Sequence, residues 1–345
     1  MNLPAAETLQ KIPGRLPSLD VSQVKMKHRR LPFMDLFVGV TDSSWFRHLA
    51  ARPDLEEVNF WRPSGKDFRA LDTGELFLFK LHHPQNVIVG GGFFARSLIL
   101  PVALAWDAFG QANGASTLIE VKARIGQYRH QPIGPLDNPS IGCILLAEPF
   151  FFPPEDWIEV PTDFAKNIVQ GKTYRTDTEA GKQLYEQVAN RLSRARGHAP
   201  STPAIEAVVL GPRYGTPRPV APRLGQGTFR ALVTEAYARR CAVTGERTLP
   251  VLEAAHIRPY GAGGEHTLGN GLLLRSDLHR LYDGGYITVD PDEHRLLVSQ
   301  RIREEFENGR HYYALEGQKI AAPQKGFTSP DAGNLRYHAE QVYRG

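Results

Sequence analysis

Short apolar runs and amphipathic segments alternate along the first half of the chain, beginning near residue 34. The apolar runs are rich in Val, Ile, Leu and Phe and are bounded by turn residues, which is typical of strands. Strands are predicted in this way at residues 36–40, 76–81, 87–94 and 142–147. Apolar residues at helical spacing predict helices at residues 43–51, 104–113, 118–128 and 178–193. Thr41 or Asp42 is placed to cap the first of these helices.

The order of these elements favours one fold class. No long helix separates consecutive strands, so the parallel sheet of an α/β protein is not favoured. Gly90-Gly91-Gly92 is expected to break the third strand. We therefore predict a small α+β domain built around a curved, barrel-like sheet.

The second half of the chain begins with a segment rich in proline and arginine. Residues 194–227 contain six prolines and five arginines, which is typical of a semi-rigid, extended linker. Regular patterns return after it. They predict a helix at 228–240, a strand at 252–257, a glycine-rich loop at 261–271, a strand at 272–274, a helix from 276 to about 282 and a hairpin at 286–298.

A length of 345 residues suits two folded domains better than one. Residues 1–33 show no sustained periodicity and are expected to be a flexible basic arm, so Met34 is a candidate for the native start. The remaining parts are an N-terminal domain at 34–193, the linker at 194–227, and a C-terminal domain with an extension at 228–345.

Composition narrows the class of protein. Hydrophobic residues make up 41% and charged residues 23%, as in ordinary globular proteins. No apolar run reaches the roughly 18 residues that span a bilayer, so no membrane partner is expected. Cys143 and Cys241 are too few for a disulfide framework, and no secretory signal pattern is present. A cytoplasmic location is therefore expected.

Charge alone gives weak support for a nucleic-acid partner. The net charge is +4, and residues 1–33 account for it with six basic against two acidic side chains. The rest of the chain is formally neutral. A prediction of nucleic-acid binding must therefore depend on local sites.

The candidate chemistry lies in the predicted strand–loop–strand–helix segment of the C-terminal domain. His279 and Asp283 are four residues apart on the predicted helix, so they share one face and can hold one cation. Imidazole and carboxylate are suitable ligands for Mg²⁺, Mn²⁺, Ni²⁺ or Zn²⁺. His256 is on the preceding strand. Taken singly, His256 also fits a hydrogen-bonded core histidine, and Asp283 also fits the start of the turn at Gly284.

These residues resemble the HNH (ββα-metal) nuclease family, in the bacterial group of restriction endonucleases. His256, Asn270 and His279 are separated by 14 and 9 residues, on the family's elements, and the resemblance covers about residues 225–310. It implies that His256 is the base that activates water and that Asn270 orients the base through the loop or supports the metal. It also implies that His279 and Asp283 bind a divalent metal, Mg²⁺ or Mn²⁺, with Ni²⁺ or Zn²⁺ as alternatives.

The sequence departs from the family pattern at two points. Ala255 stands where many relatives have a metal ligand, so either Glu253 or water supplies it. Many relatives also have two cysteine pairs for a structural zinc ion. This domain has only Cys241, so ordinary core packing must stabilise it.

The resemblance also implies a DNA partner. Arg258, Arg275 and Arg280 flank the motif and are expected to contact DNA, at least one of them its backbone. His266, in the loop, is expected to be a surface residue, and the alternative is that it contacts a phosphate. One such site cuts one strand, so a homodimer is expected if both strands of double-stranded DNA are cut.

The N-terminal domain is dense in aromatic residues, most of which are expected in the core. Phe60 and Trp61 are exceptions because residues 59–64 are predicted to form a loop. The segments 59–61, 74–80 and 87–91 resemble the PUA-like superfamily, whose SRA, EVE and YTH branches hold a flipped modified base. The resemblance implies that Trp61, with Phe60, lines a pocket for such a base. The alternative is that all these aromatic residues are core only.

The sequence thus predicts a metal-dependent DNA endonuclease, of the type that restricts DNA with modified cytosine. Two alternatives stay open. One is a non-catalytic nucleic-acid-binding protein with an HNH fold, which Ala255 favours. The other is an HNH nuclease with no modification sensing. The recognised base and its sequence context, the preferred metal, the cut position and the oligomeric state are left undecided.

Overall fold

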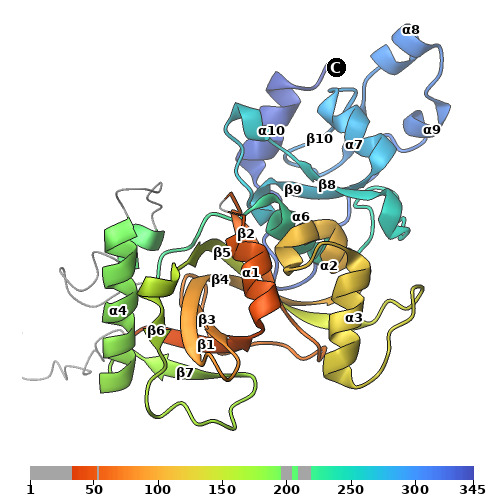
Figure 1. The fold of residues 1–345 in the computed structure, drawn as a ribbon. Helices are drawn as coiled ribbons and strands as arrows, with labels where there is room; N and C mark the ends of the chain where they lie inside the picture. Colours follow the sequence, from red (N-terminus) through yellow and green to blue (C-terminus); the bar gives the residue numbers. More distant parts are fainter. Residues whose placement is uncertain (1–32, 53, 196–203, 209–218) are drawn as a thin grey trace, which may run out of the picture. The chain divides into compact units, whose positions relative to one another are not determined.

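The computed structural model describes residues 33–52, 54–195, 204–208 and 219–345 (Figure 1). The predicted basic arm, apart from Phe33, and about half of the predicted linker are outside these ranges. None of the described helices is long and apolar enough to cross a bilayer.

A mixed sheet with short helices forms the first part of the described chain. Its strands are β1 (Asp35–Thr41), β2 (Glu57–Arg62), β3 (Leu76–Leu81), β4 (Val87–Pro101), β5 (Ser140–Phe151), β6 (Ile158–Glu159) and β7 (Gly171–Arg175). Its helices are α1 (Ser43–Ala50), α2 (Val102–Phe109), α3 (Leu118–Arg129) and α4 (Glu179–Ala195), with 3-10 turns η2 (Gly110–Asn113) and η3 (Pro154–Asp156). The strands and helices predicted for this part are all present, β3 with its predicted bounds and the others with shifted ends, and Asp42 caps α1.

The sheet has the strand order β2-β5-β4-β3-β1-β7, and β6 pairs with β4. Neighbouring strands are antiparallel except β1 and β3, which are parallel. The predicted α+β class is confirmed. Among the described strands, β2 and β7 end the sheet without pairing with each other, so the predicted barrel-like closure is not observed.

The sequence predicted that the glycine tract breaks a strand, and this prediction is wrong. Strand β4 runs through the tract and continues to Pro101. The chain instead absorbs the glycines through shifts of register against β5 near Gly91 and Phe93. A Cβ at Gly90, where φ is +158°, would be 2.2 Å from the carbonyl oxygen of Phe150. Glycine therefore permits the close approach of β4 and β5.

The prediction of a loop at residues 59–64 is wrong for residues 59–62, which belong to β2. Every residue of β2 pairs with β5, and Trp61 is opposite Cys143. Asn59 is buried and donates through Nδ2 to Oδ1 of Asn113 at 2.9 Å. Asn59, a polar residue that indicated a loop, is thus accommodated in a strand by a buried partner distant in sequence.

The C-terminal part has the predicted order of strand, loop, strand and helix. Its strands are β8 (Leu252–His256), β9 (Gly271–Arg275), β10 (Ile287–Val289) and β11 (Leu296–Val298). Its helices are α6 (Gln226–Ala236), α7 (Ser276–Asp283), α8 (Arg301–Phe306), α9 (Arg310–Tyr313) and α10 (Ala332–Gln341), with 3-10 turns η4 (Leu249–Val251), η5 (Tyr260–Ala262) and η6 (Leu268–Asn270). Helix α6 ends before the predicted Arg240 because Ala238 and Arg239 have left-handed backbone conformations. Cys241 is buried in a core with Phe229 and Tyr282.

The linker is not uniformly extended. Residues 204–208 are helical, and Ala204 and Val208 are buried in the core that contains α4. The hydroxyl of Tyr185 on α4 donates to the carbonyl oxygen of Val208 at 3.1 Å. This part of the linker therefore packs against α4, which its proline-rich composition did not indicate.

Helix α6 begins against strand β2. The backbone N–H groups of Gly227 and Thr228 donate to the buried carboxylate of Glu57, at 2.6 and 2.9 Å. A Cβ at Gly227 would be 2.5 Å from the carbonyl oxygen of Ala108, so the residue must be small. Since the first turn of α6 has no acidic side chain of its own, Glu57 provides the negative charge that its N-terminus favours.

Candidate active site

His279 lies between two carboxylates. Its Nδ1 is 2.6 Å from Oε2 of Glu253 on β8, and its Nε2 is 3.3 Å from Oδ2 of Asp283 on the same helix. The pair on α7 results from a separation of four residues, as predicted. Burial raises the pKa of Asp283, which the nearby His279 opposes and Glu253 reinforces.

The chemistry of these groups fits a divalent cation. Ligand atoms about 2.1 Å from one metal are roughly 3 Å apart, close to the 3.3 Å between Nε2 of His279 and Oδ2 of Asp283. Glu253 is on the other nitrogen, where a carboxylate commonly orients a metal-binding imidazole. In the described part of the chain, no group of three or more His, Cys, Asp or Glu residues is placed to hold a metal. A cation held by His279 and Asp283 would therefore need oxygen ligands from water or substrate.

His256 is the last residue of β8 and is half-buried. Its ring stacks on Phe229 of α6, with centroids 4.2 Å apart and planes inclined by 14°. Burial, with smaller contributions from His266 and His279, lowers the pKa of His256 to about 4. The imidazole is therefore neutral at pH 7 and is able to accept a proton.

Asn270 is fully buried, and its side chain bonds to the loop backbone. Its Oδ1 accepts from the N–H of Arg258 at 2.8 Å, and its Nδ2 donates to the carbonyls of Arg258 and Glu265 at 3.0 Å each. These bonds tie together the two ends of the loop that follows His256. Of the two roles expected for Asn270, this geometry fits orientation through the loop.

The three flanking arginines have different surroundings. Arg258 donates through Nε to the carbonyl oxygen of Ala262, and its guanidinium lies over the ring of Tyr337. Arg275 forms a two-pronged ion pair with Asp277 at 2.6 and 2.8 Å. Arg280 is exposed on α7, and the described residues contain no ion pair for it. Arg280 is thus the arginine most available to a phosphate.

Phe60 and Trp61 line a cavity of about 910 Å³ in the N-terminal part. Both side chains are more than nine-tenths buried. The indole N–H of Trp61 donates to the carbonyl oxygen of Asn113, and its ring meets Tyr128 edge to face. Tyr128, which the sequence did not single out, is 44% exposed in the same cavity wall.

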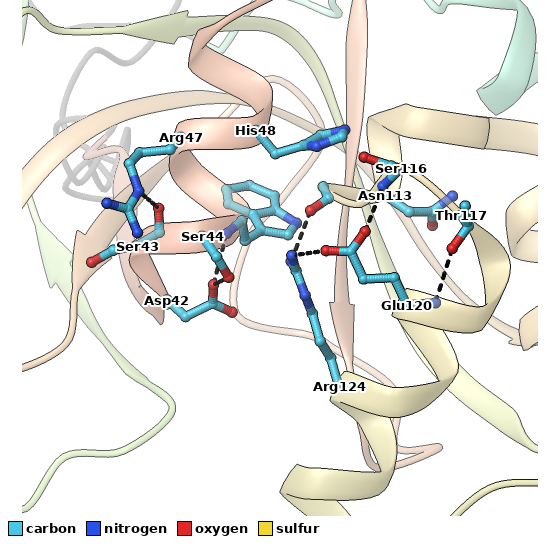
Figure 2. Close-up of polar contacts among 12 residues, drawn as sticks. Asp42, Ser43, Ser44, Arg47, His48, Asn113, Ser116, Thr117, Glu120 and Arg124 are labelled. Carbon is cyan, nitrogen blue, oxygen red and sulfur yellow. Dashed lines mark hydrogen bonds and ion pairs between the residues drawn. The ribbon is translucent and has the colours of Figure 1, made fainter.

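The segment that supports this wall is fixed by polar contacts at the starts of α1 and α3 (Figure 2). Asp42 accepts from the backbone N–H of Trp45, which also lines the cavity. On α3, Glu120 pairs with Arg124, which donates in turn to the carbonyl oxygen of Gly114. The backbone around Asn113 is therefore held in place beneath Trp61.

His266 is less exposed than the surface position that the sequence predicted. It is half-buried, and its Nδ1 is 2.9 Å from Nε2 of His256. The tertiary structure brings three further residues to the candidate histidines. Glu253 contacts His279, whereas Phe229 and His266 contact His256. Residue type was the only sequence signal for His266, since a histidine in a glycine-rich loop gives no indication of its partner.

Comparisons with known proteins bear on the C-terminal part. Residues 241–290 match the model of the family described as HNH endonuclease. Curated proteins give no match at a significant level. Among solved structures, the chain is similar to a modification dependent TagI restriction endonuclease, at 13% identity over 88% of this chain and 81% of that one, with a TM-score of 0.25. It is also similar to the Type IV phosphorothioation-dependent restriction endonuclease ScoMcrA, at 11% identity over 71% and 49% of the two chains, with a TM-score of 0.18.

The overall likeness to these structures is too low to support an argument about the whole chain. The family match is local, and it includes the candidate base, loop asparagine and both candidate metal ligands: His256, Asn270, His279 and Asp283. Residues 241–290 thus match the HNH endonuclease family, inside the region where the sequence resembles that family.

Proposed function

We propose that this protein is a metal-dependent DNA endonuclease of the restriction type, which acts on DNA that carries modified cytosine. The observation that carries the proposal is the placement of His279 between Glu253 and Asp283, in the same small domain as a neutral His256. This set pairs a cation-binding face with a proton acceptor, and the proposed phosphodiester hydrolysis uses both.

His256 accepts a proton from the water that attacks the phosphorus atom. His279 and Asp283 would hold Mg²⁺ or Mn²⁺, with Ni²⁺ or Zn²⁺ as alternatives. Such a cation supplies neutralisation of the phosphate charge and stabilisation of the leaving 3′ oxygen. Arg280 contacts a neighbouring phosphate, and Asn270 keeps the loop beside His256 in shape.

The N-terminal part is proposed to be a PUA-like reader that receives a flipped, modified base. The cavity lined by Phe60 and Trp61 supports this, because its aromatic walls suit the face of a base. The exposed ring of Tyr128 and the guanidinium groups of Arg62 and Arg129 border the same space, where the phosphates on either side of a flipped nucleotide would lie. Two copies of the chain would cut the two strands.

The proposal is tested by digesting unmodified plasmid and plasmids with 5-methyl- or 5-hydroxymethylcytosine, in EDTA and in each of the four metals. We expect cutting only with metal and only of a modified plasmid. His256→Ala should abolish cutting but leave DNA binding, whereas His311→Ala, in exposed α9, should cut like the wild type. Equal cutting of all plasmids would exclude the reader. DNA binding without cutting in any metal would favour a non-catalytic clamp.

A further inference from the structure

Two histidines contact each other at the end of β8. Nε2 of His256 is 2.9 Å from Nδ1 of His266, which is a hydrogen-bond distance. Two neutral imidazoles can form this bond only if one nitrogen carries a proton and the other does not. The direction of the bond therefore determines which nitrogen of His256 is left as a proton acceptor.

We propose that His266 is a positioning residue, which accepts the Nε2 proton of His256 and so leaves Nδ1 of His256 as the base. This inference rests on the proposed nuclease function. In the reverse arrangement, Nδ1–H of His266 donates to His256, and neutral His256 then carries its own proton on Nδ1. Both nitrogens of His256 would be occupied, and it would have no lone pair for water.

The surroundings of Nδ1 agree with this assignment. The described residues supply no hydrogen-bond partner for Nδ1 of His256, whereas Nε2 has His266. Burial lowers the pKa of His256, so the ring is neutral and exists as one of two tautomers. A fixed acceptor on Nε2 selects between them.

Aromatic rings prevent the pair from turning. Phe229 stacks on His256, and Tyr260 stacks on His266 with centroids 4.7 Å apart and planes inclined by 12°. Each imidazole thus has a flat neighbour on one face. A partial rotation of either ring would break this stacking, and a half-turn, which keeps the ring plane, would break the hydrogen bond between Nε2 of His256 and Nδ1 of His266.

The loop that carries His266 is held at its base by Asn270. Nδ2 of Asn270 donates to the carbonyl oxygen of Glu265, the residue directly before His266. Gly264 makes room for this contact, since a Cβ there would be 2.0 Å from the carbonyl oxygen of Arg258 and 2.8 Å from Nδ2 of Asn270. Asn270 thus fixes the loop that places His266 beside His256.

The tautomer of His256 is measured directly by ¹⁵N NMR of the full chain labelled at histidine, with and without Mg²⁺ and without DNA. His256→Ala identifies the signals of His256. We expect a protonated Nε2 and an unprotonated Nδ1 at pH 7.5. In His266→Ala the two tautomers should exchange and their shifts average, whereas in His266→Gln the amide oxygen should restore the wild-type pattern. A protonated Nδ1 in the wild type would overturn the proposal.

Kinetics provide the second measurement. His266→Ala should lower kcat by roughly 100-fold, the scale of a misplaced general base, with KM and DNA affinity unchanged. His266→Gln should recover most of the loss, and His311→Ala should show none. Equal kcat in His266→Ala and the wild type would also overturn the proposal. Because the NMR measurement needs no cleavage, an inactive wild type with the expected tautomer would count against the nuclease function alone.

Discussion

Glu253 and Asp283 contact opposite nitrogens of one imidazole, and this separates their roles. Asp283 faces Nε2 at a spacing that suits a shared cation, whereas Glu253 accepts from Nδ1–H at 2.6 Å. The sequence left Glu253 and water as alternatives for the ligand missing at Ala255. The geometry favours a third role for Glu253, which is to fix the tautomer and orientation of His279.

Glu253→Ala should therefore weaken metal binding without unfolding the domain. We expect the affinity for Mn²⁺ to fall by about 10- to 100-fold, the usual cost of losing such an orienting partner. Calorimetric titration of the full chain with Mn²⁺ measures this. Glu265→Gln is a matched control, because its side chain is exposed in the same domain and only its carbonyl contacts Asn270. Wild-type affinity in Glu253→Ala would contradict the assignment.

At the scale of elements, α6 connects the cavity strand to the candidate base. Glu57 of β2 accepts from the N-terminus of α6, and Phe229 of the same helix stacks on His256. Phe60 and Trp61, on the same strand as Glu57, line the cavity. The helix is thus in direct contact with both halves of the described chain.

Removal of the Glu57 carboxylate should loosen this connection. Glu57→Ala leaves two buried N–H groups without an acceptor, and we expect unfolding in urea to require about 1–3 kcal/mol less free energy. Glu56→Ala is the control, since Glu56 is the exposed neighbour. If the two variants unfold at the same urea concentration, the helix contact contributes nothing to stability.

At the scale of the whole molecule, stability should depend on pH through buried histidines. His338 of α10 stacks on Tyr282 of α7, with centroids 3.7 Å apart, and its ring nitrogens contact Thr288 and the carbonyl oxygen of Tyr282. Burial lowers the pKa of His338 to about 4, below its ordinary value of 6.5. The folded state therefore binds this proton more weakly than the unfolded chain does.

This difference in proton binding determines how the stability of the folded state changes with pH. The contribution of His338 is fully present above about pH 6.5, and it is lost as the pH falls towards 4. The loss amounts to roughly 3 kcal/mol, at about 1.4 kcal/mol per pKa unit. Urea unfolding at pH 7 and pH 4 measures it, and His338→Gln should show a smaller difference between the two. An unchanged difference in His338→Gln would mean that other groups cause the acid sensitivity.

Local patterns predicted much of the structure, and their failures have identifiable causes. The spacing of His279 and Asp283 on α7 follows from the helical period alone. Strand β2 was missed because Asn59 and Arg62 look like loop residues. The burial of Asn59 against Asn113 explains how the first of them fits in a strand. Barrel closure was predicted from the order of strands, although that order does not determine which edges pair.

The sequence by itself determined the order of elements in the C-terminal domain, its resemblance to HNH nucleases and the residue types able to bind a cation. These depend on periodicity and short spacings, which the chain carries locally. The tertiary structure alone decided that Glu253 contacts His279 across 26 residues, that His266 contacts His256, and that Phe229 supports it. Such contacts form only when separate elements pack together, so no local pattern specifies them.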